Sequence, residues 1–223
     1  MAIIGLKPYA GFGRLTASLL LAVVFLYTGP ANSDDPALGE GARLLVVKLA
    51  EQTLKSVVDV NIDRQTRQLR FKEILHEYFA FKGIAKWVLG RYWRKATEPE
   101  RDEFNVLFER LMILTYAERF EKYGGESLAI GKAEIKGEKD ALVHSTLVRP
   151  NGLKPINVIW RIRGSDEEYK IVDVMIEGLS LGLAQQKEYA SVIRKNGGTV
   201  AGLLKEMRQQ ITKQEALVKP ESG

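Results

Sequence analysis

The acidic residues Asp173 and Glu177 are the pair in this sequence best placed to do chemistry. They stand four apart in VDVMIEG, a spacing that puts both side chains on one face of a strand. Such a pair can act as general acid and base. More often it ends a strand and binds loops or an arginine, and we favour that interpretation. His76 and His144 fall in different predicted elements without metal-ligand spacing, so we expect partly exposed polar residues.

The sequence lacks the motifs that mark several common enzyme classes. It contains no GxSxG, P-loop or GxGxxG pattern. It also has no cysteine, which excludes disulfides, thiolate metal sites and thiol catalysis. We therefore expect a protein that is not an enzyme and that has no cofactor or metal. The enzymatic alternative left open is acid–base chemistry of Asp173 and Glu177 on a hydrophobic substrate.

The stretch VLGRYWRKATEPERDEF, residues 88–104, suggests a different chemistry because basic residues surround Tyr92 and Trp93. Basic and aromatic residues together are typical of nucleic-acid surfaces. The chain has 33 Lys and Arg against 28 Asp and Glu. Lys7 and Arg14 lie in the first 33 residues, which leaves 31 − 28 = +3 for the remainder. So small a balance lacks the footprint of a DNA or RNA binder. We expect one or both aromatics to pack inward, and the cations to lie at the surface.

Residues 1–33 have the pattern of a secretory signal peptide. Lys7 and Arg14 precede the apolar run LTASLLLAVVFLY, and small residues offer cleavage after Ala31 or Ser33. The run of 13 residues is shorter than the roughly 20 that a spanning helix needs. We therefore expect cleavage rather than a retained anchor, and a periplasmic product.

Helices are predicted on both sides of a central β region. Residues 34–40 look like a flexible start. Asp63 can cap a helix, and Thr97 with Glu100 can form a capping box. Apolar residues recur with helical spacing in residues 42–60, 64–79, 81–93, 97–120, 181–195 and 199–213.

Between residues 125 and 177 the apolar pattern changes to period two. Four strands are predicted, and Pro150-Asn151-Gly152 indicates a hairpin between two of them. Helices must cover the apolar face of such a meander. The predicted fold class is α+β, a twisted antiparallel sheet of about four strands covered by helices, in one domain over residues 34–216 with a disordered tail at 217–223. The strands are expected at residues 127–135, 141–149, 154–163 and 169–176.

Three segments resemble one known family. VLGRYWRKATEPERDEFNVLFERLMILTYAERFEKYGGE resembles the central signature of the MlaC family, the Ttg2-type toluene-tolerance periplasmic phospholipid-binding proteins. PNGLKPINVIWRIR resembles its hairpin, and YKIVDVMIEGLSLGLAQQKEYASVIRKNGGTVAGLL its closing segment. The resemblance covers about residues 45–210. One departure is the run LGLAQQ after Ser180, where many relatives carry polar residues.

The resemblance implies a periplasmic lipid carrier of an ABC-type transport system that maintains outer-membrane lipid asymmetry. Its implied partners are phospholipid, an outer-membrane complex of MlaA with a porin, and the MCE-domain ring of MlaD at the inner-membrane transporter. It implies a fold partly like nuclear transport factor 2, with acyl chains in an apolar cavity between sheet and helices. The alternative cargo is an isoprenoid, a hopanoid or another hydrophobic small molecule. From both layers we expect lipid contacts at Phe71, Leu75, Phe79, Phe104, Phe108, Leu111, Val158, Trp160, Val174 and Ile176.

Overall fold

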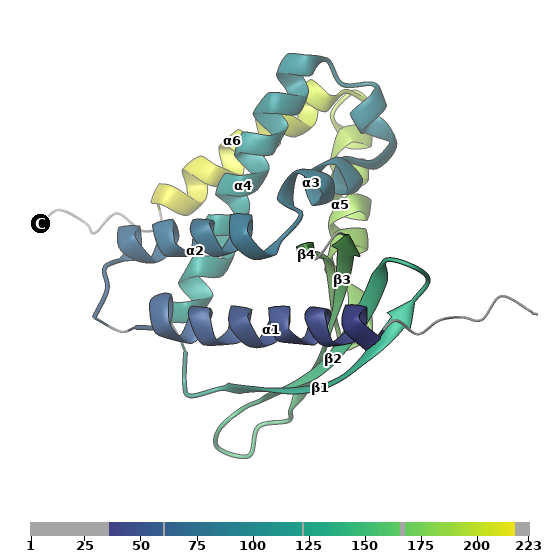
Figure 1. Ribbon diagram of the computed structural model, residues 1–223. Coiled ribbons are helices and arrows are strands. Elements are labelled where there is room, and N and C mark those ends of the chain that lie inside the picture. The colour runs from purple at the N-terminus through teal and green to yellow at the C-terminus, as the bar shows by residue number, and fades with distance from the viewer. Residues whose placement is uncertain (1–35, 60, 122, 166–167, 217–223) are drawn as a thin grey trace, which may run out of the picture. The chain divides into compact units, whose positions relative to one another are not determined.

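The computed structural model describes residues 36–216 except 60, 122, 166 and 167 (Figure 1). All of them belong to one compact unit. The predicted signal peptide and the predicted C-terminal tail lie outside the described residues. Within the described ranges, no helix is both long and apolar enough to cross a membrane.

Helices precede and follow the sheet along the chain. The first, α1, already begins at Pro36, so the prediction of a flexible start to residue 40 is wrong. Proline is tolerated in a first helical turn, and Leu38 and Ala42 are buried in the core, which stabilises the early start. The helices are α1 (Pro36–Ser56), α2 (Arg64–Tyr78), α3 (Phe81–Leu89), the 3-10 helix η1 (Gly90–Arg94), α4 (Glu98–Glu121), α5 (Leu181–Lys195) and α6 (Val200–Ala216).

The predicted helix caps are present. The Asp63 carboxylate accepts a hydrogen bond from the backbone N–H of Thr66 at 2.8 Å. At the start of α4 the backbone N–H of Thr97 donates to Glu100 Oε2 at 2.8 Å, and the N–H of Glu100 donates to Thr97 Oγ1 at 3.4 Å. These reciprocal bonds form the predicted capping box.

The sheet confirms the predicted α+β class and adds a fifth strand. Its antiparallel order is β1-β2-β3-β4-β5. Asn151 and Gly152 have φ of 60° and 71°, which is the left-handed backbone of a tight turn. This turn lies within the longer loop that joins β2 to β3, whose pairing ends at Leu147 and Ile156. The two-residue β5 pairs Leu179 with Ile176. The strands are β1 (Ser127–Lys136), β2 (Asp140–Val148), β3 (Ile156–Ser165), β4 (Glu168–Ile176) and β5 (Leu179–Ser180).

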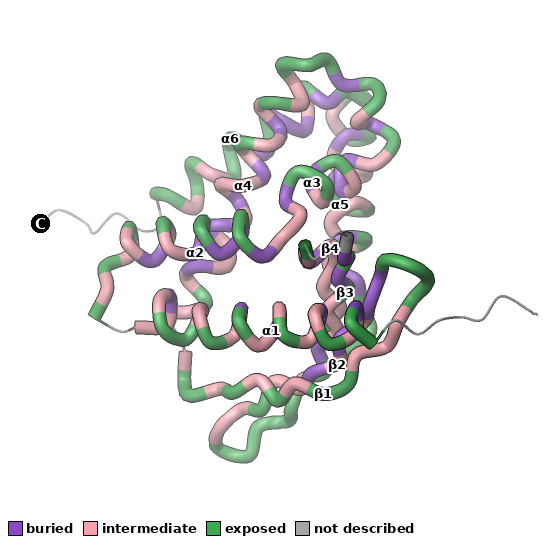
Figure 2. The backbone as a smooth tube through the Cα atoms, in the orientation of Figure 1, coloured by how far each residue is buried: buried purple, intermediate pink, exposed green. Residues whose placement is uncertain are grey.

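Two apolar clusters form the core, and α4 contributes to both. In Figure 1, α1 crosses the strands, and it contacts β1 through β4. The first cluster packs α1, α2 and the later part of α4 onto the inner face of the sheet. The second joins α3, η1, the earlier part of α4, α5 and α6. Figure 2 shows buried positions alternating with exposed ones along the helices, as expected for amphipathic elements.

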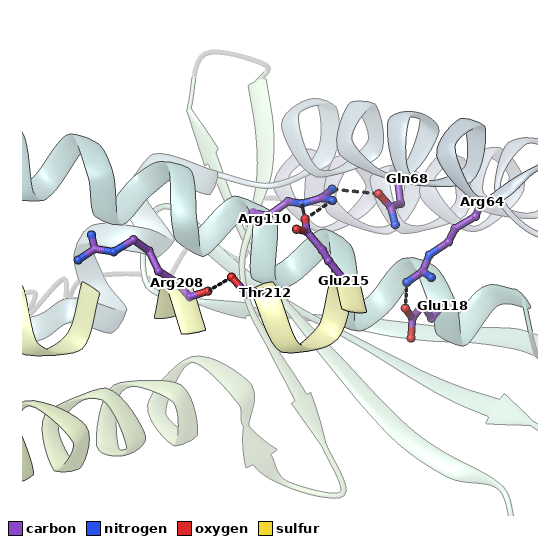
Figure 3. Close-up of polar contacts among 7 residues, drawn as sticks. All are labelled: Arg64, Gln68, Arg110, Glu118, Arg208, Thr212 and Glu215. Atoms are coloured by element: carbon purple, nitrogen blue, oxygen red, sulfur yellow. Dashed lines mark hydrogen bonds and ion pairs between the residues drawn. The ribbon is translucent and has the colours of Figure 1, made fainter. Parts of the chain in front are cut away.

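Polar side chains join α2, α4 and α6 on the side away from the sheet (Figure 3). Arg110 of α4 donates from Nε to Glu215 of α6 at 2.9 Å and from Nη1 to Gln68 of α2 at 2.9 Å. Arg64 of α2 pairs with Glu118 of α4. Each exposed pair stabilises the fold by only about 0–1 kcal/mol, so these contacts chiefly fix the alignment of helices that the apolar clusters hold together.

Candidate functional site

An apolar cavity of about 270 Å³ lies between the inner face of the sheet and the helices. It is located where the two core clusters meet. Phe71 and Trp160 in its wall belong with the first cluster, and Phe81 and Phe108 belong to the second. A cavity lined by aromatic and aliphatic side chains suits a hydrophobic ligand.

Seven of the ten residues predicted to contact lipid line this cavity. The strand register accounts for part of the set, because Trp160 lies opposite Val174 across β3 and β4 and paired residues point to the same face. That these side chains bind lipid stays a prediction. The seven are Phe71, Leu75, Phe79, Phe108, Trp160, Val174 and Ile176.

Phe104, Leu111 and Val158 do not line the cavity. Phe104 and Leu111 lie in the second cluster, where the Phe104 ring meets Tyr189 of α5 edge-on at 5.7 Å. Val158 is buried in the sheet, and its carbonyl accepts a hydrogen bond from Ser145 Oγ at 2.9 Å. The apolar stripe of α4 is wide enough to face both clusters. The spacing of its residues alone does not show which of them face the cavity and which face the second cluster.

Helix α3 supplies a part of the cavity wall that was not predicted from the sequence. Phe81, Ile84 and Val88 line the cavity and are spaced three and four residues apart, which places them on one helix face. This spacing was visible in FKGIAKWVL, but nothing in it showed that the face pointed toward the sheet. The other lining residues outside the predicted set are Met112, Tyr116, Phe120, Val172, Asp173, Leu181, Gly182 and Gln185.

The polar groups nearest the cavity have partners within the protein. Trp160 Nε1 donates to Ser145 Oγ at 2.9 Å. Asp173 Oδ1 accepts from the backbone N–H groups of Val174 at 2.9 Å and Gly182 at 3.2 Å. These bonds offset the cost of burying the polar groups and leave the apolar side chains to face the interior.

Asp173 and Glu177 play separate structural parts. Glu177 lies in the turn after β4, with φ of 49°, and its carboxylate accepts a hydrogen bond from the backbone N–H of Asn157 at 2.6 Å. Each carboxylate therefore binds backbone amides near a strand end, as the structural interpretation of the pair predicts.

The model of the MlaC protein family matches residues 48–209. The chain belongs to the MlaC family. A curated relative, the intermembrane phospholipid transport system binding protein MlaC of Haemophilus influenzae, is 23% identical over 181 residues, which is 78% of this chain and 84% of that protein. Toluene tolerance protein ttg2D of Pseudomonas putida is 25% identical over 117 residues, which is 52% of this chain and 54% of the relative.

A solved structure shares the fold of this MlaC-family protein. It is the phospholipid-binding protein of Ralstonia solanacearum in complex with a phospholipid, with a TM-score of 0.67 at 23% identity. The similarity covers 78% of this chain and 98% of the other. At that identity the comparison establishes the fold, which agrees with the α+β class predicted from the sequence.

The two histidines of this MlaC-family protein lie in polar surroundings. His76 Nε2 is 2.7 Å from Glu109 Oε2, and Lys72 Nζ is 2.7 Å from Glu109 Oε1. Burial raises the pKa of Glu109, but Lys72 and His76 outweigh it and hold that pKa below its usual range. His144 lies 3.5 Å from Glu134. Across the described residues, no group of three or more His, Cys, Asp or Glu could hold a metal ion.

The basic and aromatic segment forms the corner between α3 and α4. Tyr92 is buried and Trp93 is half-buried, whereas Arg91, Arg94 and Lys95 are exposed. Nη2 of Arg91 donates a hydrogen bond to the Tyr92 hydroxyl at 3.2 Å. The prediction that aromatics pack inward and cations lie at the surface is confirmed.

Proposed function

We propose that this protein carries phospholipid through the periplasm, with the acyl chains in the apolar cavity. The observation that carries the proposal is the cavity itself, built from both layers of a MlaC-family fold. What two similar proteins bind supports this cargo. One is a binding protein of an intermembrane phospholipid transport system, and the structural relative holds a phospholipid.

Burial of the acyl chains explains why the carrier needs a dry cavity. Each methylene removed from water contributes about 0.8 kcal/mol. Two chains of roughly 16 carbons, wholly removed from water, would gain on the order of 20 kcal/mol or more. A bilayer offers nearly the same gain, so exchange between membrane and cavity is close to neutral, whereas crossing open water is opposed by most of this energy.

The rim of the cavity suits transfer at a docked partner. Ile176 lines the cavity and is itself 37% exposed, so the apolar wall reaches the surface there. Leu179, its cross-strand neighbour, is 61% exposed, and Leu183 at the start of α5 is 45% exposed. Exposed apolar residues grouped at a cavity are typical of interaction surfaces. Contact with a partner at this rim would keep water away from the moving chains.

The proposed place of the carrier in the cell rests on the predicted export and on family membership. The proposed signal peptide directs the chain to the periplasm. The carrier takes lipid between an outer-membrane complex of MlaA with a porin and the MlaD ring of an inner-membrane ABC transporter, and so helps to maintain outer-membrane lipid asymmetry. Membership of the MlaC family and the apolar rim support this arrangement.

Lipid extraction tests the proposal. The full chain, expressed with its own leader and purified from the periplasm without detergent, should yield a diacyl phospholipid by organic extraction and mass spectrometry, near one molecule per protein. Recovery of an isoprenoid or hopanoid in its place would replace the proposed cargo with the alternative one. Recovery of neither, from protein that is folded by circular dichroism, would contradict a carrier function.

A further inference from the structure

A second hollow, a groove of about 680 Å³, lies beside the apolar cavity. On one side α3 contributes Gly83, Ile84 and Trp87, which share a helix face by their spacing. On the other side stand Arg161 and Lys170 of β3 and β4. Arg161 follows Trp160, which lines the cavity, and neighbours on a strand point to opposite faces. The groove therefore lies on the outer face of the sheet.

The groove and the cavity share part of their walls at an irregularity in β4. Ile84, Val172 and Asp173 line both spaces. The register shifts here, because Arg161 pairs with Asp173 and the next residue, Ile162, pairs with Ile171. Val172 is thus the extra residue of a β-bulge, which bends the strand and re-aims its side chains.

The opposite edge of β4 is also open at the bulge. Ile171 forms a bridge with Phe79, and strand pairing resumes only at Met175 with Ser180. Between these points, residues 172–174 have no strand partner on that edge among the residues that the structure describes. A lipid could therefore have its acyl chains in the cavity and its polar end in the groove, and it would pass from one to the other at the bulge.

Two arginines in the groove share one carboxylate. Asp140 accepts from Arg161 Nε at 2.9 Å and from Arg163 Nε at 2.7 Å, and its side chain is only 8% exposed. Burial raises the pKa of Asp140, but Arg163 and Arg161 outweigh it and keep that pKa below its usual range. The pair of guanidinium groups therefore keeps one positive charge in excess. Within the described part of the chain, their Nη1 N–H groups make no hydrogen bond.

Lys170 completes the basic side of the groove. Its Nζ donates to the backbone carbonyls of His76 and Glu77 at the end of α2, which hold it in place without a carboxylate partner in the described part of the chain. Glu168 and Asp173 are the acids in the groove wall. The total charge is thus balanced, and recognition of an anion here would rest on directed N–H donors, for which phosphate oxygens are well suited.

We propose that this groove binds the phosphate of the carried phospholipid. The phosphodiester oxygens accept hydrogen bonds from Arg161, Arg163 and Lys170, and the glycerol part passes the bulge at Val172 and Asp173. The inference rests on the proposed carrier function, because that function places the acyl chains in the adjoining cavity. Free phosphate has the same oxygen chemistry, and the test separates the two sources.

The test compares two lipids that share their acyl chains and differ only in the head group. Phosphatidylglycerol and diacylglycerol, each with a fluorescent chain label, are titrated into lipid-free full-length protein. The variants are Lys170→Gln and Arg161→Gln, because Arg163 then remains to pair with Asp140. Arg43→Gln is the control, since this arginine of α1 pairs with Glu40 and is not part of the groove wall. Urea unfolding verifies that each variant is folded.

Each groove variant should weaken phosphatidylglycerol binding about tenfold, which corresponds to about 1.4 kcal/mol, and leave diacylglycerol binding unchanged. Arg43→Gln should change neither. Equal binding of the two lipids by the wild type and by both variants would overturn the head-group site while leaving the carrier function intact. Binding of neither lipid by the wild type would overturn the carrier function, and the head-group site with it.

Inorganic phosphate is the third ligand in the test. Titrated alone into the lipid-free protein, it should bind far more weakly than phosphatidylglycerol, because it lacks the chains that hold the phosphate at the groove. Tight binding of inorganic phosphate that Lys170→Gln abolishes, together with equal binding of the two lipids, would assign the groove to free phosphate and overturn the head-group proposal.

Discussion

Val174 is the residue at which the cavity can be tested with the least change to the fold. It lies on β4 opposite Trp160, lines the cavity and is only partly buried. In Val174→Glu a carboxylate would enter the space proposed for the acyl chains, and an unpaired charge is costly in an apolar site. We expect the phospholipid recovered per protein to fall about tenfold, with a smaller effect on unfolding. Mass spectrometry of the extract and urea unfolding measure the two effects.

Val106→Glu is the matched control for this substitution. Val106 lies on α4, is 68% exposed and does not line the cavity, so lipid recovery and stability should both stay near wild type. Wild-type lipid content in Val174→Glu would show that this part of β4 does not face the cargo.

At the scale of elements, the contact between α3 and the start of α5 leaves no room for a side chain at Gly182. A Cβ built there would lie 1.9 Å from Cζ3 of Trp87. Since the indole ring is rigid, Gly182→Ala should displace it and lower the free energy of unfolding by about 1–3 kcal/mol. Gly83→Ala in α3 is the control, because its Cβ would meet only Ala80 Cβ at 3.9 Å and alanine favours a helix by up to about 1 kcal/mol. Equal stability of the two variants in urea would refute the close contact.

The link between α2 and α4 should weaken in acid. Glu109 contacts Lys72 and His76, and its pKa is lowered in the folded protein. A carboxyl whose folded pKa is lowered stabilises the fold above its unfolded pKa, near 4.5, and that stability is lost as the pH falls through the folded value. Between pH 6 and pH 3 the urea midpoint of Glu109→Gln should therefore fall less than that of the wild type. An identical pH profile in the variant would exclude Glu109 as a contributor.

Elements were predictable from the sequence where their signals are local. Three predicted features depend only on neighbours in the chain, and all three are present. They are the Asp63 cap, the Thr97–Glu100 capping box and the turn at Asn151-Gly152. The cavity wall depends on how distant elements meet. The apolar positions of α4 could face either cluster, and the part played by α3 is decided by its contacts with β4. The groove was not predicted, because the β4 bulge and the approach of α3 are tertiary features.

At the scale of the whole molecule, the cavity and its exposed rim combine in one mechanism. The cavity makes lipid binding favourable relative to water, but it offers little over a bilayer, whose interior is equally apolar. By affinity alone the proposed carrier could therefore not drive net transport. In the proposed mechanism, transfer takes place where the rim of Ile176, Leu179 and Leu183 meets a surface that excludes water. Direction would then be set by the proposed partners at the two membranes.

The dependence of transfer on chain length distinguishes this handover from escape through water. If a lipid leaves the carrier by crossing water, each methylene added to a chain removes about 0.8 kcal/mol more burial and slows release about fourfold. Handover at a docked surface keeps the chains out of water, so its rate should change by less than about twofold per methylene. Fluorescent phospholipids that differ by two methylenes, released from the loaded protein to acceptor vesicles with and without reconstituted MlaD, measure both routes. The steep dependence should appear with vesicles alone and flatten with MlaD. A steep dependence under both conditions would show that the carrier releases its cargo into water.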